Sequence, residues 1–268
     1  METGTGGPVA AYGPSWSAVA GDLVGARSVL AVCAHPDDET FGLGALLAAF
    51  AEGGIRTAVL SLTRGEASTL GAEVDDLATR RAQELAAAAA ALGAAVAGLH
   101  DHPDGSLASV PLAELAREVT AAADRVEADL LLVFDPGGVT GHPDHRRATE
   151  AALAASERAD VAVLAWTLPA VVAEALNGEL GTGFVGVEPA RVDLEFRVDR
   201  SAQFAAIECH GSQSDDNPVL RRRLELQGGV ESARWLRRPT ESGGAGRRIK
   251  PSGRGRNGNG NGTSEEAT

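Results

Sequence analysis

The sequence has few cysteines and no long apolar run, and each shortage excludes a class of structure. Its 268 residues include two cysteines, Cys33 and Cys209. Two cysteines cannot build a disulfide framework, nor can they supply the ligands of a cysteine-based structural zinc site. No apolar run reaches the roughly 18 residues that a membrane-spanning helix needs. The sequence therefore predicts a protein with no membrane span and no disulfide scaffold.

Positive charge is also scarce. Lysine and arginine total 24 against 37 acidic residues, which gives a formal net charge of −13. A nucleic-acid-binding surface needs basic side chains to displace counterions from phosphates, so no nucleic-acid partner is expected. The first residues also lack the positive and apolar regions of a secretion signal. We therefore expect a cytoplasmic protein, and the composition indicates no particular oligomeric state.

Three segments differ in composition. Residues 1–15 are rich in glycine and proline and predict a flexible N-terminus, and residues 240–268 contain too few apolar groups to offset the entropy of ordering, which predicts a disordered tail. Between them, residues 16–239 have enough apolar side chains for one folded domain.

Within that domain, short apolar runs alternate with longer helical patterns. Strands buried on both faces are predicted at residues 28–34, 57–62, 95–99 and 129–134, and helices at about 42–52, 74–92 and 112–126. This alternation predicts a Rossmann-like α/β fold, a mostly parallel sheet with helices on both faces. Strands at 161–169 and 191–199 and a helix that begins near residue 200 and ends near Gly211 predict a smaller C-terminal α+β portion beside it.

Two His-Pro-Asp motifs follow predicted strands of this sheet. "AHPDDE" follows the first strand, and "GHPDH" follows the fourth, where Pro143 is expected in the first turn of a helix. A single motif of this kind is usually a turn or a helix cap. Two at one edge of a sheet favour a metal site, and His35, Asp38 and His145 can supply the three ligands of a catalytic zinc ion. These ligands also suit Fe²⁺ or another divalent ion.

Together with "LTRGEAS", "PDGSL" and "ECHGSQ", the paired motifs resemble the PIG-L/LmbE-like de-N-acetylase family over roughly residues 28–213. Members of this family are zinc-dependent hydrolases that remove acetyl groups from N-acetylglucosaminyl substrates. The resemblance implies a metal-dependent hydrolase that removes an acetyl or other acyl group from a small amidosugar by attack of metal-bound water.

The resemblance also implies a role for each motif residue. His35, Asp38 and His145 would be the metal ligands, and Asp37 the general base. His142 would stabilise the developing oxyanion, and Asp144 would tune His142. The residues that would contact substrate are Arg64, Glu66, Asp104 and His210.

Two features depart from the family pattern. His100 and His102 precede Pro103, where an aromatic or apolar residue is common. They could bind a second metal or widen substrate choice, although such residues are more often solvated loop histidines. Thr140 stands where mycothiol-pathway relatives tend to have a tyrosine, which bears on the identity of the substrate.

Other functions fit the sequence less well. A nucleotide-binding Rossmann protein needs a glycine-rich phosphate loop after the first strand, but the carboxylates of "HPDDETFGLG" would repel a pyrophosphate. A relative that binds zinc or a sugar without catalysis would not need Asp37 and His142. An amidase acting on a thiol conjugate and an antibiotic-tailoring deacetylase stay open as alternatives.

Overall fold

The computed structural model describes residues 25–71 and 73–239. The segments 1–15 and 240–268, predicted to be flexible and disordered, lie outside the described residues. Within the described part of the chain, no helix has both the length and the apolar character needed to cross a membrane.

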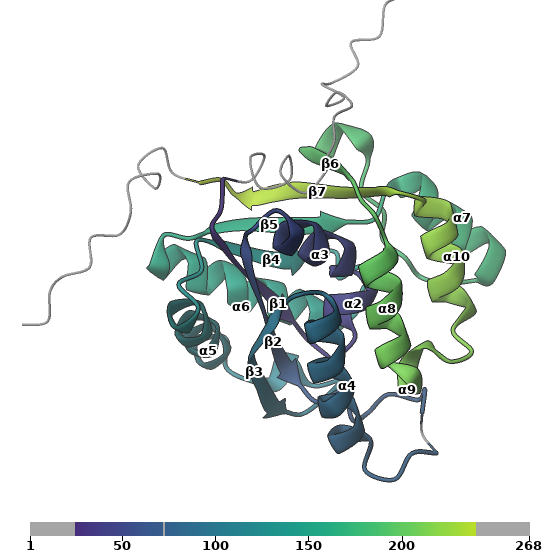
Figure 1. Ribbon diagram of the computed structural model, residues 1–268, viewed down its shortest axis with the longest axis horizontal. Helices are drawn as coiled ribbons and strands as arrows, with labels where there is room; N and C mark the ends of the chain where they lie inside the picture. Colours follow the sequence, from purple (N-terminus) through teal and green to yellow (C-terminus); the bar gives the residue numbers. More distant parts are fainter. Residues whose placement is uncertain (1–24, 72, 240–268) are drawn as a thin grey trace, which may run out of the picture.

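A single mixed sheet organises the described residues (Figure 1). Its seven strands have the order β3-β2-β1-β4-β5-β7-β6. Strands β1 to β5 are parallel, and β7 runs antiparallel to both β5 and β6. The strands are β1 (Ser28–Cys33), β2 (Arg56–Thr63), β3 (Ala95–His102), β4 (Leu130–Phe134), β5 (Ala162–Thr167), β6 (Leu194–Arg197) and β7 (Val230–Arg237).

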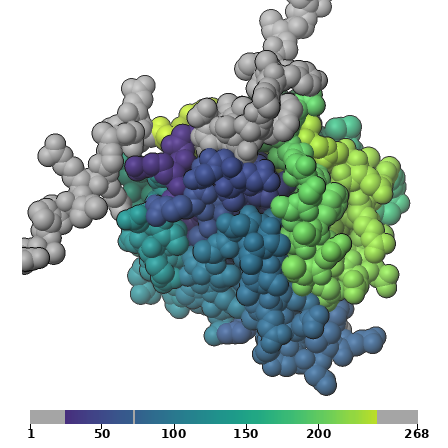
Figure 2. All heavy atoms as spheres, viewed as in Figure 1, coloured from purple at the N-terminus to yellow at the C-terminus, as the bar shows by residue number. Residues whose placement is uncertain are grey.

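Helices cover both faces of the sheet. They are α2 (Asp38–Phe41), α3 (Gly44–Glu52), α4 (Leu77–Ala91), α5 (Leu112–Arg125), α6 (Pro143–Ala159), α7 (Ala170–Leu180), α8 (Ser201–Cys209), α9 (Gly211–Ser214) and α10 (Pro218–Gln227), with 3₁₀ turns η1 (Leu107–Ser109) and η2 (Pro189–Arg191). Helices α5 and α6 pack together, and α8 packs against α4 and α3. In the space-filling view, green α8 lies along the flank of blue α4 (Figure 2).

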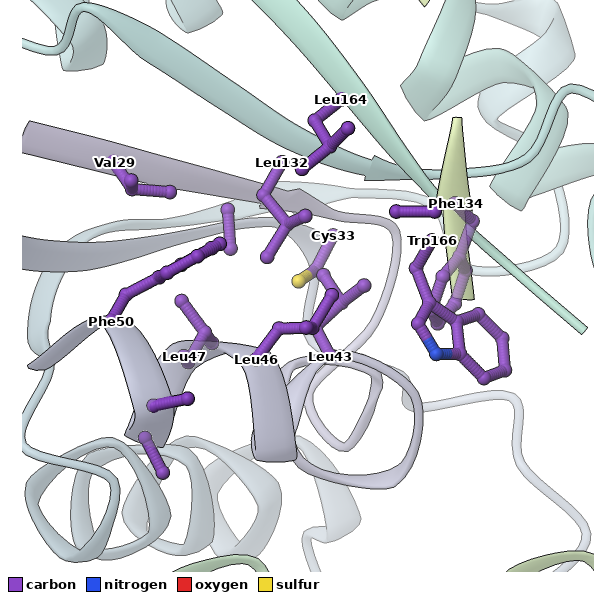
Figure 3. Packing of buried hydrophobic residues seen from close by; sticks show 14 of the residues in the cluster. Val29, Cys33, Leu43, Leu46, Leu47, Phe50, Leu132, Phe134, Leu164 and Trp166 are labelled. Atoms are coloured by element: carbon purple, nitrogen blue, oxygen red, sulfur yellow. The ribbon is translucent and has the colours of Figure 1, made fainter. Parts of the chain in front are cut away.

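Each face of the sheet has its own hydrophobic core, because successive side chains of a strand point in opposite directions. Val29 and Cys33 of β1 belong to the core with α3, and Leu30 and Val32 belong to the core with α5 and α6. Figure 3 shows the first core, with leucines of α3 directed toward β1 and β4. Because β1 is completely buried on both faces, it fixes the position of the loop that follows it.

The fold class predicted from the sequence is confirmed, with two differences. Strand β3 is an edge strand with several exposed side chains, whereas the sequence predicted burial on both faces. Its small apolar residues lie at the border of the sheet, because no strand among residues 25–71 and 73–239 pairs with its outer edge. The C-terminal strands β6 and β7 extend the same sheet and do not form a separate portion beside it.

Candidate metal centre and active site

The two His-Pro-Asp motifs meet where the strand order reverses. The chain passes outward from β1 to β2 and β3, and then returns to place β4 on the other side of β1. Ligands of open α/β sheets bind at such a switch point, beyond the carboxyl ends of the strands. The loop after β1 carries His35 to Asp38, and the loop after β4 leads into α6 at His142 and His145.

The first motif is held in an unusual backbone conformation. Asp37 has a φ of 110°, a left-handed value that non-glycine residues rarely adopt. Its backbone N–H donates to Glu39 Oε2 at 2.9 Å, and Glu39 Oε1 lies 2.5 Å from His210 Nε2. Such conformations cost about 1–3 kcal/mol and persist where the surroundings enforce them. The Glu39–His210 pair therefore positions the loop that carries the acidic residues.

Three side chains from the two motifs converge on one point. The ligand atoms of His35, Asp38 and His145 all lie within 4.8 Å of one another. His145 Nε2 lies 3.0 Å from Asp38 Oδ1, and the other oxygen of Asp38 accepts hydrogen bonds from the backbone of Ala34 and His35. A second set with the same spacing consists of His35, His142 and Asp144.

Hydrogen bonds favour the first of these two sets as the metal ligands. His145 Nδ1 lies 3.1 Å from the carbonyl oxygen of Gly138, so it carries the proton and leaves the lone pair of Nε2 facing Asp38. His142 Nδ1 accepts from the backbone N–H of Asp144 at 3.2 Å, so a neutral His142 carries its proton on Nε2 and cannot ligate there. Both oxygens of Asp144 already accept backbone N–H groups, from Gly105 and Leu107.

The electrostatics of the site also call for a cation. His35 Nε2 is buried and has no hydrogen bond, although Asp104 Oδ1 lies 3.0 Å away, off the line of such a bond. Burial lowers the pKa of His35, but the nearby Asp104 and Asp144 carboxylates outweigh it and raise this pKa to about 10. Burial likewise opposes ionisation of Asp38, yet His145 holds the pKa of Asp38 well below its usual value. The carboxylates thus stabilise positive charge where the predicted ligands meet.

Asp37 differs from its neighbour in its partners. Its Oδ2 accepts a hydrogen bond from Arg81 Nη2 at 2.7 Å, and Arg81 also donates to the carbonyl oxygens of Pro36 and Gly65. Burial raises the pKa of Asp37, and Arg81 partly offsets this. Asp37 is therefore a partly buried carboxylate, 18% exposed, that lies beside the ligand set and outside it, as a general base requires.

A cavity of about 470 Å³ opens beside these residues. His35, Asp37, Asp38, His142 and His145 line one side. An apolar wall is formed by Phe41, Leu70, Phe134, Val139, Trp166, Phe184, Val219 and Leu220, and the polar Gln213, Asn217 and Arg223 also line the cavity. The C-terminal third of the chain thus contributes to the wall of the site.

Of the predicted substrate contacts Arg64, Glu66 and Asp104, one lines this cavity. Asp104 lines it, and its Oδ2 accepts from the backbone N–H of Ala67. Glu66 instead accepts from the backbone N–H of Asp104, and Arg64 pairs with Asp101. Neither Glu66 nor Arg64 is among the lining residues.

His210 lies away from the cavity, whereas Asp144 lies close to His142. His210 is completely buried against Glu39, so it lies behind the loop and away from the cavity. The Asp144 carboxylate, also completely buried, holds the backbone at Gly105 and Leu107 and lies 3.4 Å from His35 Nε2. Its backbone N–H donates to His142 Nδ1, and its negative charge opposes the burial that lowers the pKa of His142.

The sequence analysis missed Arg81. This arginine is buried on α4, on the same face as Leu77, Leu85 and Ala88. The spacing of Arg81 from these apolar residues could have revealed it, because it places a charged residue on the buried face of a helix. Such a residue needs a partner of opposite charge or hydrogen-bond acceptors.

Comparison with known proteins identifies the family. The model of the PIG-L family, GlcNAc-PI de-N-acetylase, matches residues 30–156. The 1D-myo-inositol 2-acetamido-2-deoxy-alpha-D-glucopyranoside deacetylase of Salinispora arenicola is 32% identical over 249 residues, covering 72% of this chain and 78% of that protein. The chain belongs to the PIG-L family. The resemblance drawn from the two His-Pro-Asp motifs is thereby confirmed.

Other relatives differ in length or are more distant. The PIG-L relative of the same name from Kineococcus radiotolerans is 33% identical over an alignment of 203 residues, and the match covers 64% of this chain and about half, 52%, of that protein. A deacetylase of the teicoplanin biosynthesis pathway superposes with a TM-score of 0.60 at 23% identity, covering 78% of this chain and 96% of its own. At that identity the likeness shows the fold. These relatives are named as deacetylases, which agrees with the hydrolase class predicted for this PIG-L protein.

Proposed function

We propose that this protein is a metal-dependent N-deacetylase that hydrolyses the acetamide of an N-acetylglucosaminyl-type substrate. The observation that carries the proposal is the convergence of His35, Asp38 and His145 at one edge of a cavity, with Asp37 and His142 lining the same cavity. The names of the curated relatives support the same substrate class.

His35, Asp38 and His145 would hold the metal, and two imidazoles with one carboxylate suit Zn²⁺ while also accepting Fe²⁺. When bound, such an ion polarises a carbonyl group and makes water acidic at neutral pH. The charge of Asp38 partly neutralises the ion, and the hydrogen bond from His145 Nδ1 to Gly138 fixes the orientation of that ring.

Asp37 would move the proton. As a partly buried carboxylate, it would accept a proton from the attacking water and return it to the leaving amine, which departs poorly from an amide unless it is protonated. Arg81 holds Asp37 Oδ2 in place, which leaves the other carboxylate oxygen for this exchange. Asp37 pairs with Arg81 and Asp38 with His145, so the adjacent acids can serve two roles.

His142 would stabilise the oxyanion. Its Nδ1 is occupied by the backbone N–H of Asp144, and the pKa of His142 is lowered mainly by burial, so the neutral ring presents Nε2–H. A donor fixed in advance stabilises the charge that develops on the carbonyl oxygen.

The apolar wall bears on the group attached to the sugar. Phe41, Trp166 and Phe184 line the cavity, and burial of each CH₂ of a ligand against such a wall stabilises the complex by about 0.8 kcal/mol. We therefore favour a substrate whose aglycone has apolar surface, as an antibiotic or a thiol conjugate can have. Thr140 also lines the cavity, where its short side chain leaves room for such a group.

Acetate release tests this proposal. The zinc-loaded protein is assayed against N-acetylglucosaminides with inositol, methyl and octyl aglycones, and free amine is measured beside acetate. We expect equal amounts of both products and a higher kcat/KM for the octyl compound than for the methyl compound. A protein that releases no acetate from any of the three compounds would contradict the proposal, and equal kcat/KM values would contradict the apolar subsite alone.

A further inference from the structure

A second cluster of metal-binding side chains lies outside the cavity. His100, His102 and Glu118 each offer a ligand atom, and these atoms all lie within 4.8 Å of one another. None of the three lines the cavity described above. The cluster joins the end of edge strand β3 to the middle of α5, which packs against it.

The backbone explains why the two imidazoles face the same way. Strand β3 continues to His102, so residues 100 and 102 are two apart on one strand and project from the same face of the sheet. Their rings are stacked, with centroids 5.9 Å apart and planes inclined by 10°. Asp101 lies between them in sequence, and its side chain pairs with Arg64.

Glu118 faces both rings from α5. His102 Nε2 lies 2.7 Å from Glu118 Oε2, and His100 Nδ1 lies 3.5 Å from Glu118 Oε1. Two ligands on a tetrahedral zinc ion, each about 2.0–2.1 Å from the metal, lie about 3.3–3.4 Å apart. Small side-chain movements would therefore bring the three groups into coordination.

A simple ion pair accounts for only part of this arrangement. The 2.7 Å contact joins one oxygen of Glu118 to His102, but the other oxygen faces His100 at 3.5 Å and the two rings are stacked together. A divalent cation engages both neutral rings and the carboxylate together. The side chains of His100, His102 and Glu118 are 34%, 14% and 23% exposed, so an ion can reach the cluster from solvent while part of its shell stays protein.

We propose that His100, His102 and Glu118 form a second divalent-cation site, of the class that Zn²⁺ occupies, separate from the catalytic site. Two imidazoles and one carboxylate are ligands that zinc accepts, with water completing its coordination. Asp104, two residues beyond His102, lies 3.0 Å from His35 Nε2. A cation at the second site would thus hold the end of β3 in place, and the loop that carries Asp104 begins at this end.

Zinc titration of the metal-free full chain, followed by calorimetry and by metal analysis after dialysis, tests the proposal. Wild-type protein should bind two ions per chain. The double variant His100→Asn/His102→Asn and the single variant Glu118→Gln should each keep one ion and weaken the other at least about tenfold, since even changes outside the ligand shell commonly cost 10–100-fold. His145→Asn should lose the catalytic ion and keep the second one.

Asp101→Asn is the matched control, because it removes an acidic group from the same strand but from outside the cluster, and it should still bind two ions. Circular dichroism and thermal unfolding of each variant establish that it is folded. Two findings would overturn the proposal: wild-type protein that binds one ion, or a Glu118→Gln variant that binds the second ion as tightly as wild type. Neither result bears on the proposed catalytic site, which the metal content of the His145→Asn variant tests separately.

Discussion

Replacing Arg81 with methionine should destabilise the fold, because it leaves the Asp37 carboxylate without its partner. The two side chains are 3% and 18% exposed and lie 2.7 Å apart. Removing one member of a buried ion pair costs about 3–5 kcal/mol. Since Asp37 keeps some contact with solvent, we expect the lower end, about 3 kcal/mol, which corresponds to a fall in Tm of roughly 6–12 °C for a domain of this size.

A double-mutant cycle separates this effect from a loss of packing. In an Asp37→Asn background, where no charge is left behind, Arg81→Met should cost about 2 kcal/mol less than it does in wild type. Urea unfolding with chelator present gives the free energies of unfolding without a contribution from bound metal. Arg56→Met is the control, because Arg56 and its partner Glu127 are both exposed and their pair should contribute about 0–1 kcal/mol. Equal losses from Arg81→Met in both backgrounds would refute the coupling.

Two further predictions concern the same loops. Gly65→Ala should lower the free energy of unfolding, measured with urea, by about 2–5 kcal/mol, because Gly65 has a φ of +66° and an added Cβ would lie 2.1 Å from Arg81 Nη1. Gly54→Ala is the control: Gly54 also has a positive φ, but no atom lies within 4 Å of the added Cβ, so this variant should lose only about 1–2 kcal/mol. His142→Asn keeps a good helix N-cap but loses the Nε2–H donor, so it should retain full metal in metal analysis while kcat falls about 10²–10³-fold. Loss of metal in that variant would instead assign His142 to the ligands.

Much of the fold follows from local sequence patterns. The strands ending at Cys33, Thr63 and Phe134 were predicted within one residue, because each is a short apolar run that ends at a polar motif. Pro143 marked the first turn of α6, with His142 as its cap, as expected. The two motifs could be paired in advance because parallel strands bring their carboxyl ends to one edge.

Long-range pairing explains what the sequence did not reveal. Strand β7 was not predicted, because its mixture of charged and apolar residues becomes a strand only between β5 and β6. The strand character of His100 and His102 was missed for a similar reason, since it depends on pairing with β2. His210 was expected at the cavity, but its position behind Glu39 depends on how α8 packs on the N-terminal half.

Metal content and acetate release, measured side by side in Asp37→Asn and Asp38→Asn, test the central claim most directly. The Asp37 variant should keep its catalytic metal, since the three ligands remain, and lose about 10²–10⁴-fold in activity, the usual contribution of a positioned acid or base. The Asp38 variant should lose its metal and regain part of its activity in excess metal, because it lacks the only carboxylate ligand. Equal metal loss in both variants, or earlier loss in the Asp37 variant, would contradict the assignment of ligand and base.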